Sequence, residues 1–594
     1  MKKKFINIFL IAVSLMLTGI SCKKLDETQP YDKITEDEVW SSKDNAMKFV
    51  YNAYSNVVGL YTNMVGDEVW TNNIIASDGN AFTRDQISRD EDYGFNKFAQ
   101  VRMCNLIIEK ANSSLLADVD KAELVAHGKF LRAMTYYWLA RRFGRVIYVD
   151  RVLTEDEETY SLPQTASVAE TYSLIMKDIN EAIPGLPDVA ATSLAGKTAG
   201  YALKSEVALQ AAAYTGDDTY YQQSVDAADA VIQSGRHALE PDYEGMFNAR
   251  KSSTTEIILA FYRDKSNTVV SNITDMQLSI PNVNNDDVTR EGATPHFKQD
   301  KVFEDWGKYS PTQNLIDDYL VIDDNDPTKA VRWDQSSQFM ANLSHRNSSF
   351  ADSAVVTGAG SVNSVIYRNR DLRFAASVVY DSTQWYGETV TTNRNGNLNR
   401  MIKGSLGSGC CTPITNTFHR KGIYDDLVPR AFYNTPTNYH WVVFRLGRVI
   451  LNKAEALLRQ GKVAEAVATF NQTRTFHGGL PPSTAAGAAD AWTDYKRERR
   501  VELFKELDYY WTLLRWGKYG GDANHNLAPG GTIPELETPP TFMEINIPRD
   551  GYRVEVLKWN QNEVRVFDES RRYLLPIQQS QVDRHGSLQQ NPNW

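Results

Sequence analysis

The densest group of residues that could do chemistry is Glu498, Arg499, Arg500 and Glu502, within one predicted helix. Two carboxylates can hydrolyse a glycosidic bond when they lie about 5 Å or about 6.5–9.5 Å apart. The same four residues could instead form an ion-pair network that braces packed helices. Because apolar residues surround them at helical spacing, the sequence favours the structural interpretation.

Two acidic segments, Asp317–Asp318 and residues 323–326, could bind calcium through their carboxylate oxygens. They lack the glycine and the terminal glutamate of an EF-hand loop, so a solvated acidic loop is the favoured interpretation. The chain also contains no HExxH motif, no GxSxG motif and no phosphate-binding loop. We therefore predict no catalytic residues, no metal site and no cofactor, and we do not expect an enzyme.

Aromatic residues in polar loops are the remaining candidates for a binding site. Sugar rings present apolar C–H faces that stack on Trp and Tyr, while their hydroxyls hydrogen-bond to amides, carboxylates and guanidinium groups. We predict ligand-contacting side chains at Trp70, Asn72, Trp306, Tyr309, Trp333 and Trp385. Each of them could instead be a packing residue, and no motif selects among them.

The elements that must position these groups are amphipathic helices, most clearly between His440 and Lys518. A first helix is predicted by apolar residues spaced three and four apart, namely Val442, Leu446, Val449, Ile450, Ala454 and Leu457. Gly461 separates it from a second helix that ends at Gly478. A third helix is predicted to run without a break from Lys496 to Lys518.

Further helices are predicted at residues 41–57, 98–116, 121–143, 167–183, 197–214 and 219–234. The chain is therefore expected to be mainly α-helical, a tetratricopeptide-like scaffold of helix pairs over about 41–240 and 440–520. Between 240 and 440 the composition shifts to Asn, Asp, Ser, Thr and Gly, with brief strands at 256–262 and 374–380, which predicts an irregular insertion. With a C-terminal tail at 521–594, residues 41–594 are expected to form a single domain.

The N-terminus has the pattern of a bacterial lipoprotein signal. Lys2–Lys4 precede an apolar run from Phe5 to Leu17, which is too short for an ordinary spanning helix. Gly19-Ile20-Ser21-Cys22 is typical of a lipobox, so residues 1–21 are predicted to be a signal peptide. Cys22 would then carry lipid and begin a tether that extends to residue 40. A simple cleavable signal with an incidental cysteine is the alternative.

Composition limits the class of partner. The 594 residues carry a formal net charge of -10, which argues against nucleic acid. Apart from Cys22, only Cys104, Cys410 and Cys411 are present, from which we expect no disulfide framework.

Several stretches carry a resemblance to a known family. The segment from Arg445 to Arg474, followed by RERRVELFKELDYYWTLLRWGK, resembles the conserved C-terminal half of the SusD/RagB family. FLRAMTYYWLARRFGRVIYVD resembles its N-terminal signature, and YLLPIQQSQVDRHGSLQQNPNW resembles its usual ending. Gln578, Gln581 and Trp594 depart from that ending, but none of them falls on an expected ligand position.

The resemblance implies a nutrient-binding lipoprotein of Bacteroidetes, anchored in the outer membrane and facing the cell exterior. It implies a protein that captures a glycan or its oligosaccharides and delivers them to a SusC-like TonB-dependent transporter without catalysis. A surface glycoside hydrolase, a binder of peptide or glycoprotein nutrients, and a pure interaction scaffold remain alternatives.

Overall fold

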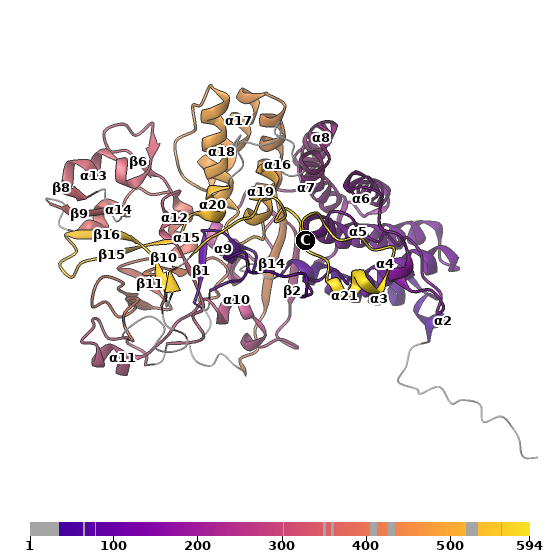
Figure 1. Ribbon diagram of the computed structural model, residues 1–594, viewed down its shortest axis with the longest axis horizontal. Coiled ribbons are helices and arrows are strands. Elements are labelled where there is room, and N and C mark those ends of the chain that lie inside the picture. The colour runs from indigo at the N-terminus through magenta and orange to yellow at the C-terminus, as the bar shows by residue number, and fades with distance from the viewer. Residues whose placement is uncertain are drawn as a thin grey trace, which may run out of the picture.

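Long helices make up one side of the molecule, and short strands and helices make up the other (Figure 1). The computed structural model describes residues 35–594 except 63–65, 78, 301, 348–351, 358–360, 404–410, 412, 426–433, 518–532, 560 and 563. The predicted signal peptide and Cys22 therefore lie outside the described residues. Across the described part of the chain, every helix is too short or too polar to cross a membrane.

The predicted scaffold of paired helices is confirmed. Its helices are α3 (Lys43–Val58), α4 (Phe98–Ser113), α5 (Asp118–Phe143), α6 (Val168–Ala182), α7 (Lys197–Thr215), α8 (Thr219–Gln233), α16 (Leu446–Arg459) and α17 (Val463–Phe476). Ser42 and Ser167 cap two of them by accepting a backbone N–H of the first turn. Because α8 packs against α16, the scaffold is continuous across the insertion.

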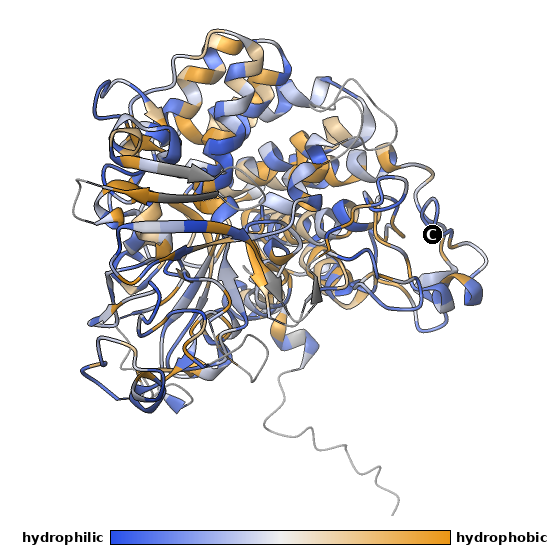
Figure 2. Cartoon of the chain, turned by 60° about the vertical axis from the view of Figure 1, so that its left-hand side comes forward, coloured by the Kyte–Doolittle hydropathy of each residue, from blue (hydrophilic) through white to orange (hydrophobic). Residues whose placement is uncertain are grey.

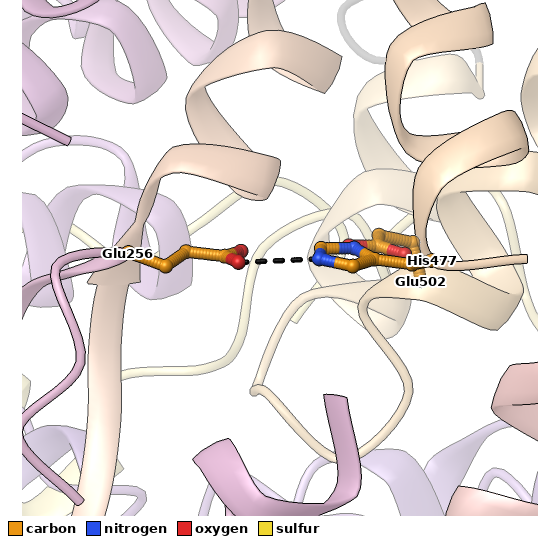
Figure 3. Close-up of side chains that lie close together, drawn as sticks. All are labelled: Glu256, His477 and Glu502. Carbon is orange, nitrogen blue, oxygen red and sulfur yellow. Dashed lines mark hydrogen bonds and ion pairs between the residues drawn. The ribbon is translucent and has the colours of Figure 1, made fainter. Parts of the chain in front are cut away.

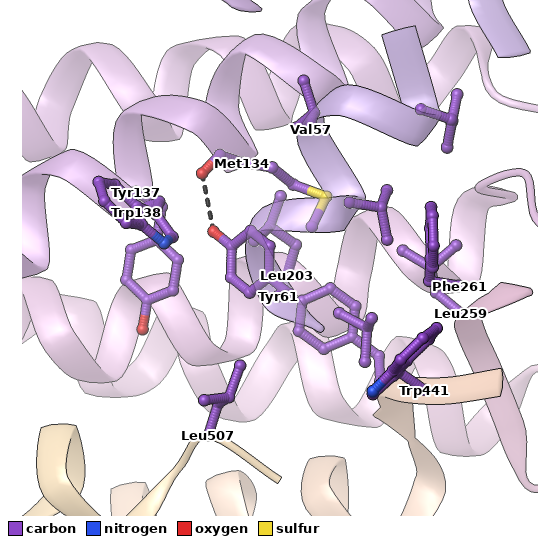
Figure 4. Packing of buried hydrophobic residues seen from close by; sticks show 14 of the residues in the cluster. Val57, Tyr61, Met134, Tyr137, Trp138, Leu203, Leu259, Phe261, Trp441 and Leu507 are labelled. Atoms are coloured by element: carbon purple, nitrogen blue, oxygen red, sulfur yellow. Dashed lines mark hydrogen bonds between the residues drawn. The ribbon is translucent and has the colours of Figure 1, made fainter. Parts of the chain in front are cut away.

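The largest hydrophobic cluster lies among these helices, includes a strand pair (Figure 4), and continues into the insertion as far as Phe303 and Trp385. Tyr61 is buried and donates its hydroxyl to the carbonyl of Met134 at 2.8 Å. Phe261 and Trp441 add the apolar face of the strand pair. Hydrophobic and hydrophilic residues alternate along the helices (Figure 2), as expected for helices that bury one face.

One strand of that pair corrects the first predicted helix. Val442 belongs to β14 (Tyr439–Arg445), which pairs antiparallel with β2 (Ile257–Arg263), and α16 begins only at Leu446. All seven residues of β14 are buried, so their apolar run cannot be separated by periodicity from the helix that follows. The predicted strand at 256–262 is confirmed as β2.

The predicted continuous helix from Lys496 to Lys518 is also corrected. It is two helices, α18 (Ala488–Glu502) and α19 (Tyr509–Trp516). Between them Lys505 and Leu507 have positive φ angles of 58° and 54°, which no helix allows. The carboxylate of Asp508 meanwhile accepts hydrogen bonds from Arg499 and Thr512. The backbone N–H of Lys505 also donates to Glu68, so a contact with another part of the fold helps to override the helical preference of this segment.

The insertion consists of loops with short elements. Its helices are α9 (Tyr243–Met246), α10 (Thr274–Gln277), α11 (Asn285–Arg290), α12 (Gln313–Ile316), α13 (Ser337–Asn342), α14 (Val362–Ile366) and α15 (Leu372–Ser377). Two-stranded pairings join β1 (Ile74–Ala76) to β5 (Tyr309–Pro311), β3 (Asn282–Val283) to β4 (Phe303–Glu304), β6 (Val321–Ile322) to β7 (Ala330–Val331), β10 (Val378–Val379) to β13 (Phe418–His419), and β11 (Thr383–Trp385) to β12 (Glu388–Val390). The strand predicted at 374–380 is therefore mostly the helix α15.

Strands of the C-terminal tail lie inside the insertion. β8 (Leu343–Asn347), β9 (Asp352–Val356), β15 (Thr541–Ile545) and β16 (Gly551–Val556) form one sheet in the order β15-β16-β9-β8. Smaller elements are α2 (Glu36–Val39), α20 (Pro534–Glu537), α21 (Gln579–Arg584), β17 (Lys558–Trp559) and β18 (Gln561–Asn562). Cys411 is disulfide-bonded, whereas Cys104 is free and buried.

Candidate functional site

The charged residues of α18 form a buried ion network, as the sequence favours. Glu498 and Glu502 both accept from Arg373, at 3.0 Å and 2.7 Å. Glu502 also accepts from Arg445 at 2.6 Å. Burial alone would raise the pKa of Glu502, but His477 and Arg445 hold it well below its ordinary value. A carboxylate enclosed in this way cannot reach a glycosidic bond.

Glu256, His477 and Glu502 lie close enough together to hold a metal ion (Figure 3). His477 is placed 3.2 Å from Glu256 and 2.7 Å from Glu502, and Arg445 contacts both carboxylates. Burial lowers the pKa of His477, but Glu502 and Glu256 outweigh it and raise that pKa to about 9. A protonated imidazole and a guanidinium already neutralise these carboxylates, so the group belongs to the ion network.

The carboxylates of the acidic segments accept hydrogen bonds from other residues of the protein. Asp317 accepts from the indole of Trp333 at 2.8 Å, and Asp318 accepts from Arg500 at 2.7 Å. Asp323 accepts from the backbone and hydroxyl of Ser337. These carboxylates stabilise turns of the insertion and, through Asp318, join it to α18.

Trp70 and Asn72 join the loop between α3 and α4 to the helices α18 and α19. Trp70 is half-buried and stacks on Phe82 with ring centroids 3.9 Å apart, while Tyr510 meets it edge-on. Asn72 is buried and accepts from Arg500 at 2.8 Å. Both side chains are engaged in holding this loop in place.

The expectation that Trp333 and Trp385 face solvent is wrong. Their exposed fractions are only 2% and 1%. Trp333 packs against Phe339 and donates to an aspartate, and Trp385 packs against Phe303. Each lies in an element of three residues, which is too short for periodicity to show which face is buried. We therefore assign both to packing and not to a ligand site.

Trp306 is the predicted aromatic residue that remains open to solvent, with 44% of its surface exposed. It lies between β4 and β5, where its backbone N–H donates to the carbonyl of Gln277 at 2.9 Å. Tyr309, three residues further on in β5, is half-buried. The backbone thus fixes the position of the loop that carries the exposed Trp306.

A cavity of about 620 Å³ lies between the insertion and the C-terminal tail. Its walls are the loop 391–402, the hairpin of β15 and β16, and the residues that follow α11. The carboxylate of Glu544 accepts from the amides of Asn399 and Asn416, at 3.3 Å and 3.1 Å. No hydrogen bond or ion pair with another described residue engages the guanidinium of Arg394, which is exposed at the wall. The cavity therefore offers both donors and acceptors.

The loop 391–402 is held firmly in its shape. Asp381 is buried and accepts the backbone N–H groups of Thr392 and Asn393, at 2.6 Å and 2.8 Å. A Cβ on Gly396 would lie 2.3 Å from the carbonyl oxygen of Thr391, so only glycine fits at this close approach. The cavity wall is thus preorganised, which lowers the entropic cost of binding a ligand.

The cavity and Trp306 are joined through a short chain of contacts. Lys403 follows the cavity residue Ile402 and donates to Asn282 at 3.1 Å. Asn282 is in turn the register partner of Glu304, two residues before Trp306. Sequence reasoning missed the cavity, although the run of Arg and Asn from Arg394 to Arg400 was a signal of a polar, turn-rich surface.

Comparison with known proteins identifies the family. A protein-family model described as "SusD family" matches residues 255–594, and a SusD-like model described as "Starch-binding associating with outer membrane" matches residues 25–209. SusD-like protein P2 from Formosa agariphila is 29% identical over 149 residues, which is 24% of this chain. The match spans 28% of that relative's length.

Solved structures share the fold at low sequence identity. A SusD-like protein from Bacteroides fragilis superposes with a TM-score of 0.72 at 23% identity, covering 95% of this chain and 100% of that one. A laminarin-binding SusD-like protein gives 0.60 at 16% identity, and surface glycan-binding protein A from Bacteroides fluxus gives 0.59 at 18%. Each of the latter two comparisons covers 93% of this chain and 100% of the other. The chain belongs to the SusD family.

Proposed function

We propose that this protein binds a glycan at the cell surface and delivers it to a SusC-like TonB-dependent transporter without catalysis. Membership of the SusD family and the fold shared with glycan-binding proteins support the proposal. The observation that carries it is the polar cavity, whose wall is linked through Lys403 and Asn282 to the strand that precedes the exposed Trp306. A sugar ring would stack on the indole, and hydroxyls would bond to Glu544 and the amides around it.

Replacing Trp306 with alanine should weaken binding about five- to a hundredfold, since stacking a sugar on an indole contributes about 1–3 kcal/mol. The thermal midpoint should hardly move, because much of the side chain is already exposed. Retardation in polysaccharide affinity gels measures the first effect, and a thermal melt measures the second. Trp306→Phe is the matched control and should retain most of the affinity. Unchanged binding by Trp306→Ala would remove this residue from the site.

The same assay separates the alternatives. A glycoside hydrolase should release reducing ends from a retained polysaccharide, whereas a binding protein should leave the polysaccharide intact. A pure interaction scaffold should neither retain the polysaccharide nor cleave it. A binder of peptide or glycoprotein nutrients should retain those ligands and ignore polysaccharides.

Anchoring to the outer membrane through lipid on Cys22 forms part of the proposal. Replacing Cys22 with alanine should move the protein from the membrane fraction to the soluble fraction, because buried acyl chains contribute about 0.8 kcal/mol per CH₂ group. Cell fractionation and palmitate labelling measure this. A Cys104→Ala variant, which alters a free and buried thiol, should stay in the membrane fraction. Continued labelling of the Cys22→Ala protein would contradict lipidation at this position.

Delivery to a transporter predicts a stable complex. Affinity purification from outer membranes in mild detergent should recover a large TonB-dependent barrel protein in near-equal amount. The family resemblance motivates this expectation. Recovery of the monomer alone under the same conditions would count against the transporter partner.

A further inference from the structure

Arginine side chains gather around the cavity. Arg394, Arg400 and Arg553 all line it, together with the carboxylates of Glu291 and Glu544. Two of these five charges are neutralised locally. Arg553 pairs with Glu555 at 2.8 Å, and Glu291 pairs with Arg290 at 3.2 Å. Arg394 and Arg400 then face the single carboxylate of Glu544, which leaves an excess of positive charge.

Arg400 is held in this position by packing. Its guanidinium lies 4.1 Å from the centroid of the Phe542 ring and donates to the carbonyl of Ile414 at 3.3 Å. Burial lowers the pKa of Arg400. The carboxylates of Glu544 and Glu555 partly offset this effect, whereas Arg553 lowers that pKa further. A positive charge is therefore kept in a partly desolvated cavity with incomplete compensation, in a chain whose formal net charge is -10.

Such an arrangement is suited to an anion. Guanidinium groups bind carboxylates and sulfates through paired N–H donors, and these charge-assisted bonds are about twice as strong as neutral ones. A neutral sugar would use the hydroxyl-binding groups of the cavity but would leave the excess positive charge uncompensated. An acidic sugar would use both.

We propose that the cavity binds an acidic glycan, with a carboxylate or sulfate group held by Arg394 and Arg400 and neighbouring hydroxyls held by Asn395 and Glu544. This inference rests on the proposed function, because it names the class of glycan for the same site. Sugar carboxylates and sulfate esters share the recognition chemistry, so the experiment must contain both.

The test compares matched pairs of oligosaccharides by titration calorimetry. One pair is polygalacturonate oligosaccharides and their carboxyl-reduced form, and the other is carrageenan oligosaccharides and their desulfated form. In at least one pair, the acidic member should bind about tenfold or more tightly than its neutral counterpart. This preference should shrink as salt rises from low to about 0.3 M, since exposed charges are screened. The pair that shows the preference distinguishes carboxylate from sulfate.

Arg394→Gln is the variant that tests the site, because this exposed guanidinium supports no other described contact. It should lose most of the acidic preference while keeping the thermal midpoint. Arg151→Gln removes one surface charge from the helical scaffold and should leave the preference intact. A preference that survives Arg394→Gln would overturn the assignment of the site. Equal affinity for both members of each pair would overturn the inference alone. Failure to retain any acidic or neutral glycan would overturn the proposed function with it.

Discussion

Replacing Glu502 with glutamine should lower the free energy of unfolding by about 3–5 kcal/mol, the range for breaking a buried ion pair from one side. Glu502 is fully buried and accepts from Arg373, Arg445 and His477 at 2.6–2.7 Å. Glutamine has nearly the same shape but no charge, and its amide nitrogen cannot accept a hydrogen bond. Three cationic groups would then lose a shared counterion in the interior.

Urea unfolding followed by circular dichroism measures this change. Glu181→Gln is the matched control, because Glu181 pairs with Lys129 at 2.6 Å on an exposed face of α6. Surface pairs contribute little, so the control should unfold close to the wild type. Equal unfolding free energies of the Glu502→Gln protein and the wild type would show that the buried ion network does not stabilise the fold.

The contribution of His477 to stability should be lost as the solution becomes alkaline. Its folded-state pKa of about 9 lies above the ordinary value of 6.5, so the folded protein binds the proton more tightly than the unfolded chain. The stabilisation is therefore complete below about pH 6.5 and declines as the pH rises through about 9. At about 1.36 kcal/mol per pKa unit, the change amounts to about 3 kcal/mol.

Comparison of the wild type with His477→Gln between pH 6 and pH 10 isolates this effect. The stability advantage of the wild type should shrink steadily over that interval. Lys421 and Lys505, whose pKa values burial lowers to about 8, titrate in the same interval with the opposite sign. They are present in both proteins, so their contributions cancel. A constant stability advantage of the wild type over His477→Gln across this interval would contradict a protonated imidazole in the network.

The helices were largely predictable because their signals are local. For α7 and α8, apolar periodicity and the turn at Gly216, whose φ is 72°, predict both helices to within one or two residues. The break between α18 and α19 was not predictable from such signals. It depends on Asp508 meeting Arg499, and on the backbone N–H of Lys505 reaching Glu68 from a distant part of the chain.

The candidate site was less predictable for the same reason. Trp306 could be proposed from its polar surroundings, but Trp333 and Trp385 have similar surroundings and are buried. Only the packing of neighbouring segments distinguishes them. The cavity forms where the loop 391–402 contacts the hairpin of β15 and β16. The spacing of residues within either segment does not predict this long-range contact.

The sheet that contains β9 and β16 also determines the order in which parts of the chain can fold. β9 pairs with a strand about 200 residues later, and contacts over such separations form slowly because a long loop must close first. The helices can assemble from local contacts, but the cavity wall must wait for nearly the last segment to be synthesised. Until that segment arrives, β9 is an open edge onto which another chain can add. A chain shortened before β15 would keep most of its helical signals, lose a wall of its cavity and become prone to aggregate.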